Sequence, residues 1–156
     1  MVFRPGFGRI TTIAYRNGIL AADTQAEAGG WIVPGEVGKI RRIDADTVAA
    51  VTGDWGCIEP WLKWYAGDRS SPYDLGEDSR IILAHARDGL TIYEGKGWFK
   101  VTAPFAAWGS GWPAAVAAMH MGADAKRAIE VAMLCDPSTG GEVQVVPVRS
   151  AVARAA

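Results

Sequence analysis

The sequence has few of the side chains that most metal and disulfide sites require. Its 156 residues include two cysteines, Cys57 and Cys135, and two histidines, His85 and His120. Two cysteines so far apart form neither a CxxC metal pattern nor a disulfide framework. We therefore expect two free thiols in a reducing compartment, with a single disulfide as the less favoured alternative. We predict no metal site and no cofactor, and a Ser-His-Asp triad is poorly supplied.

The sequence also lacks a strong charge of one sign and a long hydrophobic run. It carries 16 Lys and Arg against 17 Asp and Glu, a formal net charge of −1. The densest basic cluster, residues 39–42, is too short to predict a nucleic-acid interface, which needs a basic face or run. No apolar stretch is long enough to span a bilayer, and the first residues lack the apolar run of a signal peptide. We expect a cytoplasmic protein, or a virion component if a phage encodes it, that binds neither nucleic acid nor a membrane.

The hydrophobic content is sufficient for one core. Hydrophobic residues make up 49% of the chain, and a chain of this length corresponds to one compact domain. We assign residues 11–150 to that domain. Residues 1–10, MVFRPGFGRI, form a leader or an N-terminal arm in this interpretation.

Short strands joined by tight turns are predicted over the first two thirds of the sequence. Two runs rich in strand-forming residues, 11–15 and 19–23, flank Asn17-Gly18, the strongest two-residue hairpin signal. Further strands are predicted over 39–43, 47–51, 81–86, 90–94, 98–102 and 105–108. Residues 24–38 are small, polar and Gly-rich, and we expect loops there that would line a substrate pocket.

Three helices and a last strand complete the predicted order of elements. Apolar side chains recur at helical spacing over residues 57–66, and an Ala- and Met-rich stretch over 113–135 predicts two more helices. The second of these two begins after Gly122, with Asp124 placed as its N-cap. The final strand is predicted over 142–148. Hairpins outnumber βαβ units, so we expect an α+β fold of mostly antiparallel sheets with helices packed outside them.

Five short motifs occur in a particular order along the chain. They are TTIAYRNGILAADTQ, GKIRRI, VAAVTGD, AAWGSG and DPSTGG, with the small-residue helix pair between the last two. In this order they resemble the proteasome-type N-terminal-nucleophile (Ntn) hydrolases, including the HslV-type bacterial peptidase subunits and the short proteasome-like proteins of bacteria and phages. The resemblance runs from Thr11 to about Val148. It implies a four-layer αββα sandwich, which fits the predicted order of strands and helices.

The resemblance also implies roles for individual residues. Thr11 matches the N-terminal nucleophile. Asp23 matches an aspartate that pairs with a lysine, and Lys39 matches that lysine. The backbone N–H of Gly53 matches the donor to the oxyanion, and Ser110 matches a serine near the amine of the nucleophile.

Two more residues complete the set of seven. Asp136 and Thr139 match the Asp-x-x-Ser/Thr-Gly segment that supports the site in this family. Each of the seven taken alone has an ordinary structural interpretation, such as a strand threonine, a solvated charge or a tight loop. The functional hypothesis therefore depends on their occurring together.

The chemistry of such a set is consistent. A threonine hydroxyl is a weak nucleophile and needs a neighbouring base. A free α-amine on the same threonine, with a pKa of about 7.7–8.0, is a suitable base. The ammonium of Lys39 would favour the deprotonated amine and a forming alkoxide, and Asp23 would keep that lysine charged. The predicted reaction is hydrolysis of a peptide or other amide through an acyl-enzyme on Thr11.

Three features depart from the family pattern. Ile10 precedes Thr11, which fits neither removal of an initiator Met nor self-cleavage after Gly, and while Ile10 is attached the Thr11 nitrogen is an amide. Residues 57–79 have room for one helix where HslV-type chains carry two, so we expect a truncated helix layer. Asp54 places a carboxylate beside the presumed oxyanion glycine.

The seven tryptophans support more than one interpretation. The ordinary interpretation is that they pack in the hydrophobic core. A subunit interface is the alternative, because Trp is common among the residues that anchor interfaces, and a sugar-binding platform is a weaker third. Trp31 and Trp55 are expected in loops.

Two functions from different classes stay open. The first is a threonine-type Ntn peptidase or amidohydrolase, homo-oligomeric and active once the leader is removed. The second is a non-catalytic Ntn-fold assembly subunit, part of an oligomer or of a phage particle, that keeps its N-terminal arm. A small-molecule or glycan binder is a third and weaker interpretation.

Overall fold

The computed structural model describes residues 11–151, and the predicted leader or arm over residues 1–10 lies outside the described residues. The elements, in chain order, are β1 (Thr12–Arg16), β2 (Ile19–Ala22), β3 (Gln25–Ala28), β4 (Trp31–Glu36), β5 (Ile40–Arg42), β6 (Thr47–Thr52), the 3-10 helix η1 (Trp55–Cys57), α1 (Ile58–Ala66), β7 (Arg80–His85), β8 (Gly89–Glu94), β9 (Gly97–Val101), β10 (Phe105–Gly109), α2 (Trp112–His120), α3 (Ala125–Cys135) and β11 (Gln144–Pro147). The predicted strands and helices are confirmed, with small differences at their ends.

Two antiparallel sheets form the centre of the molecule. One has the strand order β10-β1-β2-β11, and the other has the order β5-β6-β7-β8-β9. The β1–β2 hairpin closes at Asn17-Gly18, where both residues have positive φ, 50° and 73°, as a type I′ turn requires. This turn fixes the register of the hairpin. As a result Ile13 faces the second sheet and Ala14 faces the helices.

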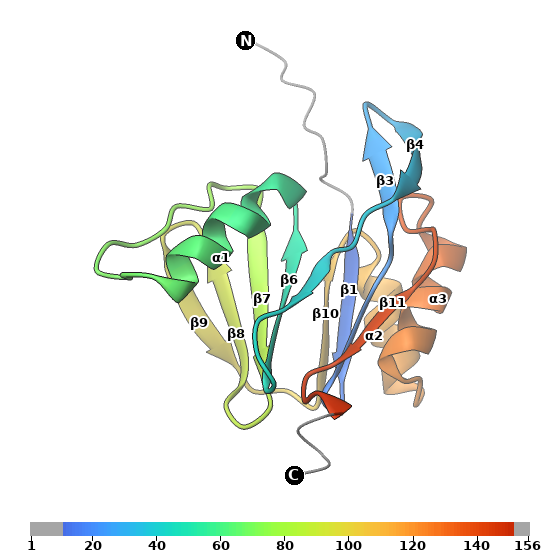
Figure 1. Ribbon diagram of the computed structural model, residues 1–156. Coiled ribbons are helices and arrows are strands. Elements are labelled where there is room, and N and C mark those ends of the chain that lie inside the picture. Colours follow the sequence, from blue (N-terminus) through green and yellow to red (C-terminus); the bar gives the residue numbers. More distant parts are fainter. Residues whose placement is uncertain (1–10, 152–156) are drawn as a thin grey trace.

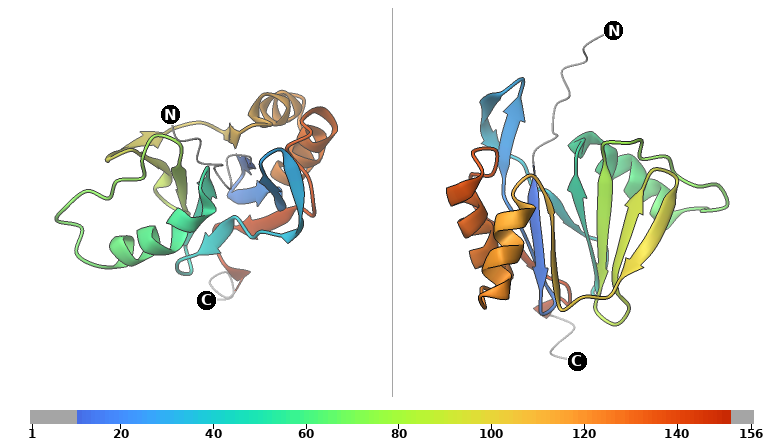
Figure 2. Two further views of the ribbon diagram at one scale, coloured as in Figure 1. Left: turned by 90° about the horizontal axis from the view of Figure 1, so that it is seen from above. Right: turned by 180° about the vertical axis from the view of Figure 1, so that it is seen from behind.

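The two sheets pack face to face, with helices on both outer sides (Figure 1, Figure 2). Between the sheets lies a cluster of buried residues that includes Ile13, Leu20, Ile82 and Ile92. α2 and α3 cover the four-stranded sheet, where small residues such as Ala14 permit close packing. α1 covers the five-stranded sheet. The layers are therefore αββα, which confirms the predicted α+β sandwich of mostly antiparallel sheets.

The helix layer over the five-stranded sheet consists of α1 alone within residues 11–151. Trp61 of this helix is fully buried. It stacks on Tyr65 with ring centroids 5.0 Å apart and meets Tyr93 edge-on at 5.2 Å. Aromatic packing thus covers this sheet, and the predicted truncation of the helix layer is confirmed.

The prediction of loops over residues 24–38 is wrong. β3 and β4 form an antiparallel hairpin there, and it extends beyond the two sheets (Figure 1). Its turn is Gly29-Gly30, where both residues have positive φ, and a Gly-Gly pair between two strand-forming runs is itself a hairpin signal. Trp31, expected in a loop, lies in β4 and is 80% exposed.

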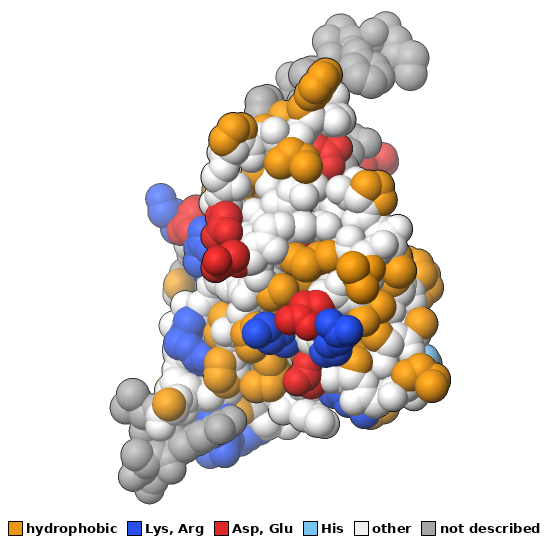
Figure 3. All heavy atoms as spheres, turned by 90° about the vertical axis from the view of Figure 1, so that its right-hand side faces the viewer, with side chains coloured by type: hydrophobic (Ala, Val, Ile, Leu, Met, Phe, Trp, Pro, Cys, Tyr) orange, Lys and Arg blue, Asp and Glu red, His pale blue; other side chains and the backbone are white. Residues whose placement is uncertain are grey.

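The tryptophans divide between the core and the surface. Trp61 is buried, whereas Trp31, Trp98 and Trp112 are at least half exposed. Core packing therefore accounts for only part of the set. Figure 3 shows the side that carries α3 and the β3–β4 hairpin, where hydrophobic side chains lie among charges of both signs. In the described part of the chain, no helix is both long enough and apolar enough to cross a membrane.

Candidate active site

A lysine–aspartate pair is buried where the ends of the two sheets meet. Asp23 follows β2 of the four-stranded sheet, and Lys39 precedes β5 of the five-stranded sheet. The Lys39 ammonium donates to Asp23 Oδ1 at 2.8 Å, and both side chains are 0% exposed. The same carboxylate accepts the backbone N–H groups of Thr12 at 2.9 Å and of Gly140 at 3.2 Å. The pair therefore joins both sheets and the segment that leads into β11.

Burial controls the ionisation of this pair. It raises the pKa of the Asp23 carboxyl and lowers the pKa of the Lys39 ammonium. In each case the attraction of the partner opposes the shift without cancelling it. Lys39 is thus a cation that gives up its proton more readily than an exposed lysine does, and Asp23 orients it.

Thr11 and Thr12 have different surroundings although they are neighbours in the sequence. The Thr12 hydroxyl accepts the Gly111 N–H at 2.9 Å and contacts the Thr139 hydroxyl at 2.7 Å. The Thr11 hydroxyl oxygen instead accepts the indole N–H of Trp55 at 3.1 Å. Thr12 is therefore engaged in holding the sheet end together, which leaves Thr11 as the candidate nucleophile.

Trp55 links Thr11 to the buried pair. Its ring lies over the Lys39 ammonium, whose nitrogen is 5.3 Å from the ring centroid, within the range of a cation–π contact. One indole thus contacts both the candidate nucleophile and the lysine. The sequence predicts a loop at Trp55 and assigns it no role in the site, but the residue lies in η1. Its position two residues after Gly53 is the signal that could have identified it.

A second polar network joins Thr12 to the segment before β11. The Thr139 hydroxyl donates to Asp136 Oδ2 at 2.6 Å, so the Thr12 hydroxyl must donate to Thr139. Asp136 also accepts the Ser138 backbone N–H at 3.1 Å and a hydrogen bond from the Ser110 side chain. Burial raises the pKa of Asp136, but the hydrogen bonds from these three residues outweigh burial and hold the pKa below its ordinary value.

Asp136 should therefore make folding stability depend on pH in acid. Because its folded pKa lies below the ordinary value of 3.8, the stability that it contributes is fully present above that pH. This stability is lost as the pH falls through the lower, folded pKa. Urea unfolding at stepped pH values below about 5 should show a steeper loss for the wild-type chain than for Asp136→Asn. Equal slopes for the two chains would contradict the prediction.

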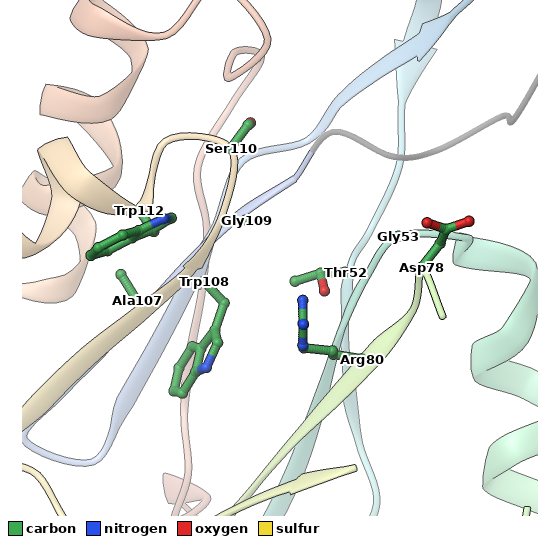
Figure 4. Close-up of a pocket in the computed structure, with 9 residues that line it drawn as sticks. All are labelled: Thr52, Gly53, Asp78, Arg80, Ala107, Trp108, Gly109, Ser110 and Trp112. Carbon is green, nitrogen blue, oxygen red and sulfur yellow. The ribbon is translucent and has the colours of Figure 1, made fainter. Parts of the chain in front are cut away.

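Gly53 directly follows β6 and has a backbone conformation that favours glycine. Its φ is +90°, and a Cβ there would overlap the backbone carbonyl of Asp78. Gly53 also lines a cavity of about 570 Å³. The other lining residues are Thr52, Asp78, Arg80, Ala107, Trp108, Gly109, Ser110 and Trp112. Figure 4 shows the side chains of Arg80 and Trp108 projecting from the two sheets into the space between them.

All of the predicted site residues lie at one end of the two sheets. They are Thr11, Asp23, Lys39, Gly53, Ser110, Asp136 and Thr139. The Asp54 carboxylate is exposed and accepts the Gly56 N–H at 2.8 Å, which caps the start of η1. Cys57 and Cys135 are free thiols. Within residues 11–151 no three His, Cys, Asp or Glu side chains cluster in a way that could hold a metal ion.

Comparison with solved structures shows the architecture. Thiobacillus denitrificans BPH in complex with epoxomicin has a TM-score of 0.64 to this chain, at 20% identity over 90% of this chain and 99% of that one. A second structure of BPH from the same organism gives 0.64, at 21% identity over 87% and 95% of the two chains. Eukaryotic HslV from Trypanosoma brucei gives 0.60, at 20% identity over 86% and 97%. The chain has a proteasome-like Ntn fold.

This likeness is one of fold. No family model matches the sequence, and no curated protein matches it. Within the proteasome-like fold, Thr11 directly precedes β1 of one sheet, and Lys39 directly precedes β5 of the other. The predicted architecture is therefore confirmed, while the chemical roles of the seven site residues stay predictions.

Proposed function

We propose that the chain is a threonine-type Ntn hydrolase that cleaves peptide or other amide bonds with Thr11 as its nucleophile. The observation that carries this proposal is the connection of the Thr11 hydroxyl, through Trp55, to the buried Lys39–Asp23 pair. A buried ammonium near the nucleophile favours a deprotonated amine and a forming alkoxide. The proteasome-like fold, and its likeness to a protein solved in complex with epoxomicin, support the same function.

The proposed reaction starts from a chain in which Thr11 is the first residue. Its α-amine takes the proton from Oγ1 as Oγ1 bonds to the carbonyl carbon of the substrate, and the carbonyl π electrons move to oxygen. The Gly53 N–H stabilises this oxyanion, an effect of about 3–4 kcal/mol. When the carbonyl re-forms, the C–N bond breaks and the Thr11 ammonium gives its proton to the leaving amine. Water then hydrolyses the ester on Thr11 by the same sequence of steps.

Removal of the leader is the activating step in this proposal. While Ile10 is bonded to Thr11, the nitrogen of Thr11 is an amide and has no basic lone pair. Lys39 cannot replace this base without leaving the Asp23 carboxylate unpaired in the core. The bond between Ile10 and Thr11 must therefore be cut before Thr11 can act.

A chain that is cut after it has folded tests the proposal. A protease recognition sequence placed directly before Thr11 leaves Thr11 as the first residue, which N-terminal sequencing and intact mass verify. The cut chain should hydrolyse peptide amides more than about a thousandfold faster than Thr11→Ala cut in the same way. It should also gain the mass of one epoxomicin molecule, whereas the uncut chain should not. Equal rates for the two cut chains would show that Thr11 is not the nucleophile.

The surface of the β3–β4 hairpin favours a second candidate function. Trp31 and Ile32 are 80% and 67% exposed on this hairpin, and exposed aromatic and apolar side chains are typical of subunit contacts. The chain would then be a non-catalytic assembly subunit, in a homo-oligomer or a phage particle, that keeps residues 1–10. Deleting residues 1–10 should in that case lower the mass measured by light scattering and produce no hydrolysis.

A further inference from the structure

Trp55 occupies the space directly beside the candidate nucleophile. Its indole nitrogen lies 3.1 Å from Thr11 Oγ1, and Thr11 is 0% exposed. The indole ring also covers the Lys39 ammonium. A large rigid side chain therefore lies within hydrogen-bond distance of the hydroxyl that would attack a substrate.

A short, well-bonded turn holds this indole in place. Trp55 is the first residue of η1, whose start is capped by the Asp54 carboxylate at 2.8 Å from the Gly56 nitrogen. The Cys57 N–H donates to the Asp54 carbonyl at 3.2 Å. The turn begins directly after Gly53. The proposed oxyanion donor and the indole are thus held on one segment.

The carbonyl of Thr11 is hydrogen-bonded to a segment that borders a cavity. The Ser110 N–H donates to the Thr11 carbonyl at 3.0 Å. Ser110 borders the cavity of about 570 Å³ that Gly53 also lines (Figure 4). This cavity offers space for a bulky part of a substrate, and Trp55, which contacts the Thr11 hydroxyl, is not among the residues that line it.

We propose that Trp55 determines the substrate specificity of this site by size. Its indole restricts the substrate residue that binds beside it, next to the scissile bond, to a small side chain such as that of Gly or Ala. The proposal rests on the proposed function of Thr11. Removal of the indole leaves a space that fits an aromatic side chain, and the Lys39 ammonium would then face that ring.

Two pairs of peptides test this size filter. One pair carries Ala or Phe as the last residue of the acyl part, and the other pair carries them as the first residue of the leaving part. The chain cut before Thr11 should prefer Ala by about tenfold or more in one pair. Trp55→Ala should abolish that preference by raising kcat/KM for the Phe peptide.

Two variants serve as controls for the lost tryptophan. Trp55→Phe keeps a ring beside Thr11 but removes the N–H donor, so it should retain the preference for Ala. Trp98→Ala removes a tryptophan that is 62% exposed on β9, and it should leave both ratios unchanged. If Trp55→Ala hydrolyses the peptides with both ratios within about twofold of the parent chain, the size filter is overturned and the proposed function stands.

A second readout needs no hydrolysis and uses the full, uncut chain. In ¹H–¹⁵N NMR spectra the indole signal of Trp55, identified by its absence in Trp55→Phe, should shift in Thr11→Val, because valine lacks the acceptor oxygen. An unshifted signal overturns the contact on which the filter depends. A shifted signal together with a cut chain that hydrolyses none of the peptides overturns the proposed function, and the filter with it.

Discussion

Replacing Lys39 by methionine is expected to lower the free energy of unfolding by about 3–5 kcal/mol at neutral pH. The substitution leaves the Asp23 carboxylate, 0% exposed, without its partner at 2.8 Å. Methionine fills a similar volume, so the loss reports the unpaired charge rather than a cavity. The backbone N–H groups of Thr12 and Gly140 remain as donors to Asp23, and they limit the loss without replacing the ammonium.

The deficit of Lys39→Met should shrink as the pH is lowered. Burial already raises the pKa of Asp23 above the ordinary value of 3.8, and without the lysine this pKa rises further. A carboxyl with a raised folded pKa binds its proton more tightly in the folded state, so stability is gained as the pH falls through that value. Urea unfolding at several pH values measures this, and a deficit that does not change between neutral and acid pH would contradict it.

A double variant and a surface pair serve as controls. Asp23→Asn combined with Lys39→Met removes both charges, so it should recover most of the stability that the single variant loses. Arg41 and Glu59 form an ion pair whose side chains are 40% and 66% exposed, and Arg41→Met should cost less than about 1 kcal/mol. A double variant as unstable as Lys39→Met alone would show that the unpaired charge is not the cause.

Local turn chemistry makes most of the fold predictable. The Asn17-Gly18 turn and the Asp124 cap are each specified by residues that are adjacent or nearly adjacent in the sequence. In the structure both turn residues have positive φ, and Asp124 accepts the Arg127 N–H at 2.7 Å. Because such signals mark where strands and helices start and stop, the order of elements follows from them, and the order leaves few ways to form layers.

The composition of residues 24–38 leads to a wrong prediction of loops, because the strands there pair without burying a hydrophobic core. β4 is exposed along its whole length, so it lacks the alternation of apolar and polar residues that identifies a half-buried strand. Pro34 and Gly35 inside it also favour a turn. Cross-strand pairing with β3 and the Val37 N–H, which donates to the Thr24 carbonyl at 2.9 Å, hold this segment instead. The Gly29-Gly30 pair is the one local signal of this hairpin, and the contact between Val37 and Thr24 has no signal in the sequence.

The site residues come together only in the tertiary structure, and the periodicity of hydrophobic residues in the sequence cannot predict such contacts. Asp23 and Lys39 are 16 positions apart, and Thr12 and Thr139 are 127 apart. Motif order, through the resemblance, predicts that such residues belong together. Trp55 is in none of those motifs. Its contact with Thr11 exists only because the ends of the two sheets meet, which explains why the sequence assigns it no role in the site.

Gly109 is the position at which a single methyl group should have the largest effect. Its φ is +95°, and a Cβ there would overlap the carbonyl oxygen of Thr11. Gly109 pairs with Thr12 across β10 and β1, and the next residue, Ser110, donates its N–H to that same carbonyl at 3.0 Å. The methyl group cannot fit unless the start of β1 moves. Gly109→Ala should therefore lose more than about 4 kcal/mol of unfolding free energy, or fail to fold.

Gly122→Ala separates this overlap from backbone strain. Gly122 has a similar φ of +98°, with open space where the Cβ would lie, so alanine there costs only the left-handed conformation, about 1–2 kcal/mol. Urea unfolding measures the free energy of unfolding of both variants. If Gly109→Ala does not fold, circular dichroism of the soluble fraction shows the loss of its secondary structure. Equal stability of Gly109→Ala and Gly122→Ala would show that a Cβ at position 109 does not overlap the Thr11 carbonyl. The overlapping carbonyl belongs to Thr11, the candidate nucleophile, whose hydroxyl contacts Trp55. Any Gly109→Ala protein that folds should therefore also show a shifted indole signal for Trp55, because the same substitution disturbs both the sheet and the site.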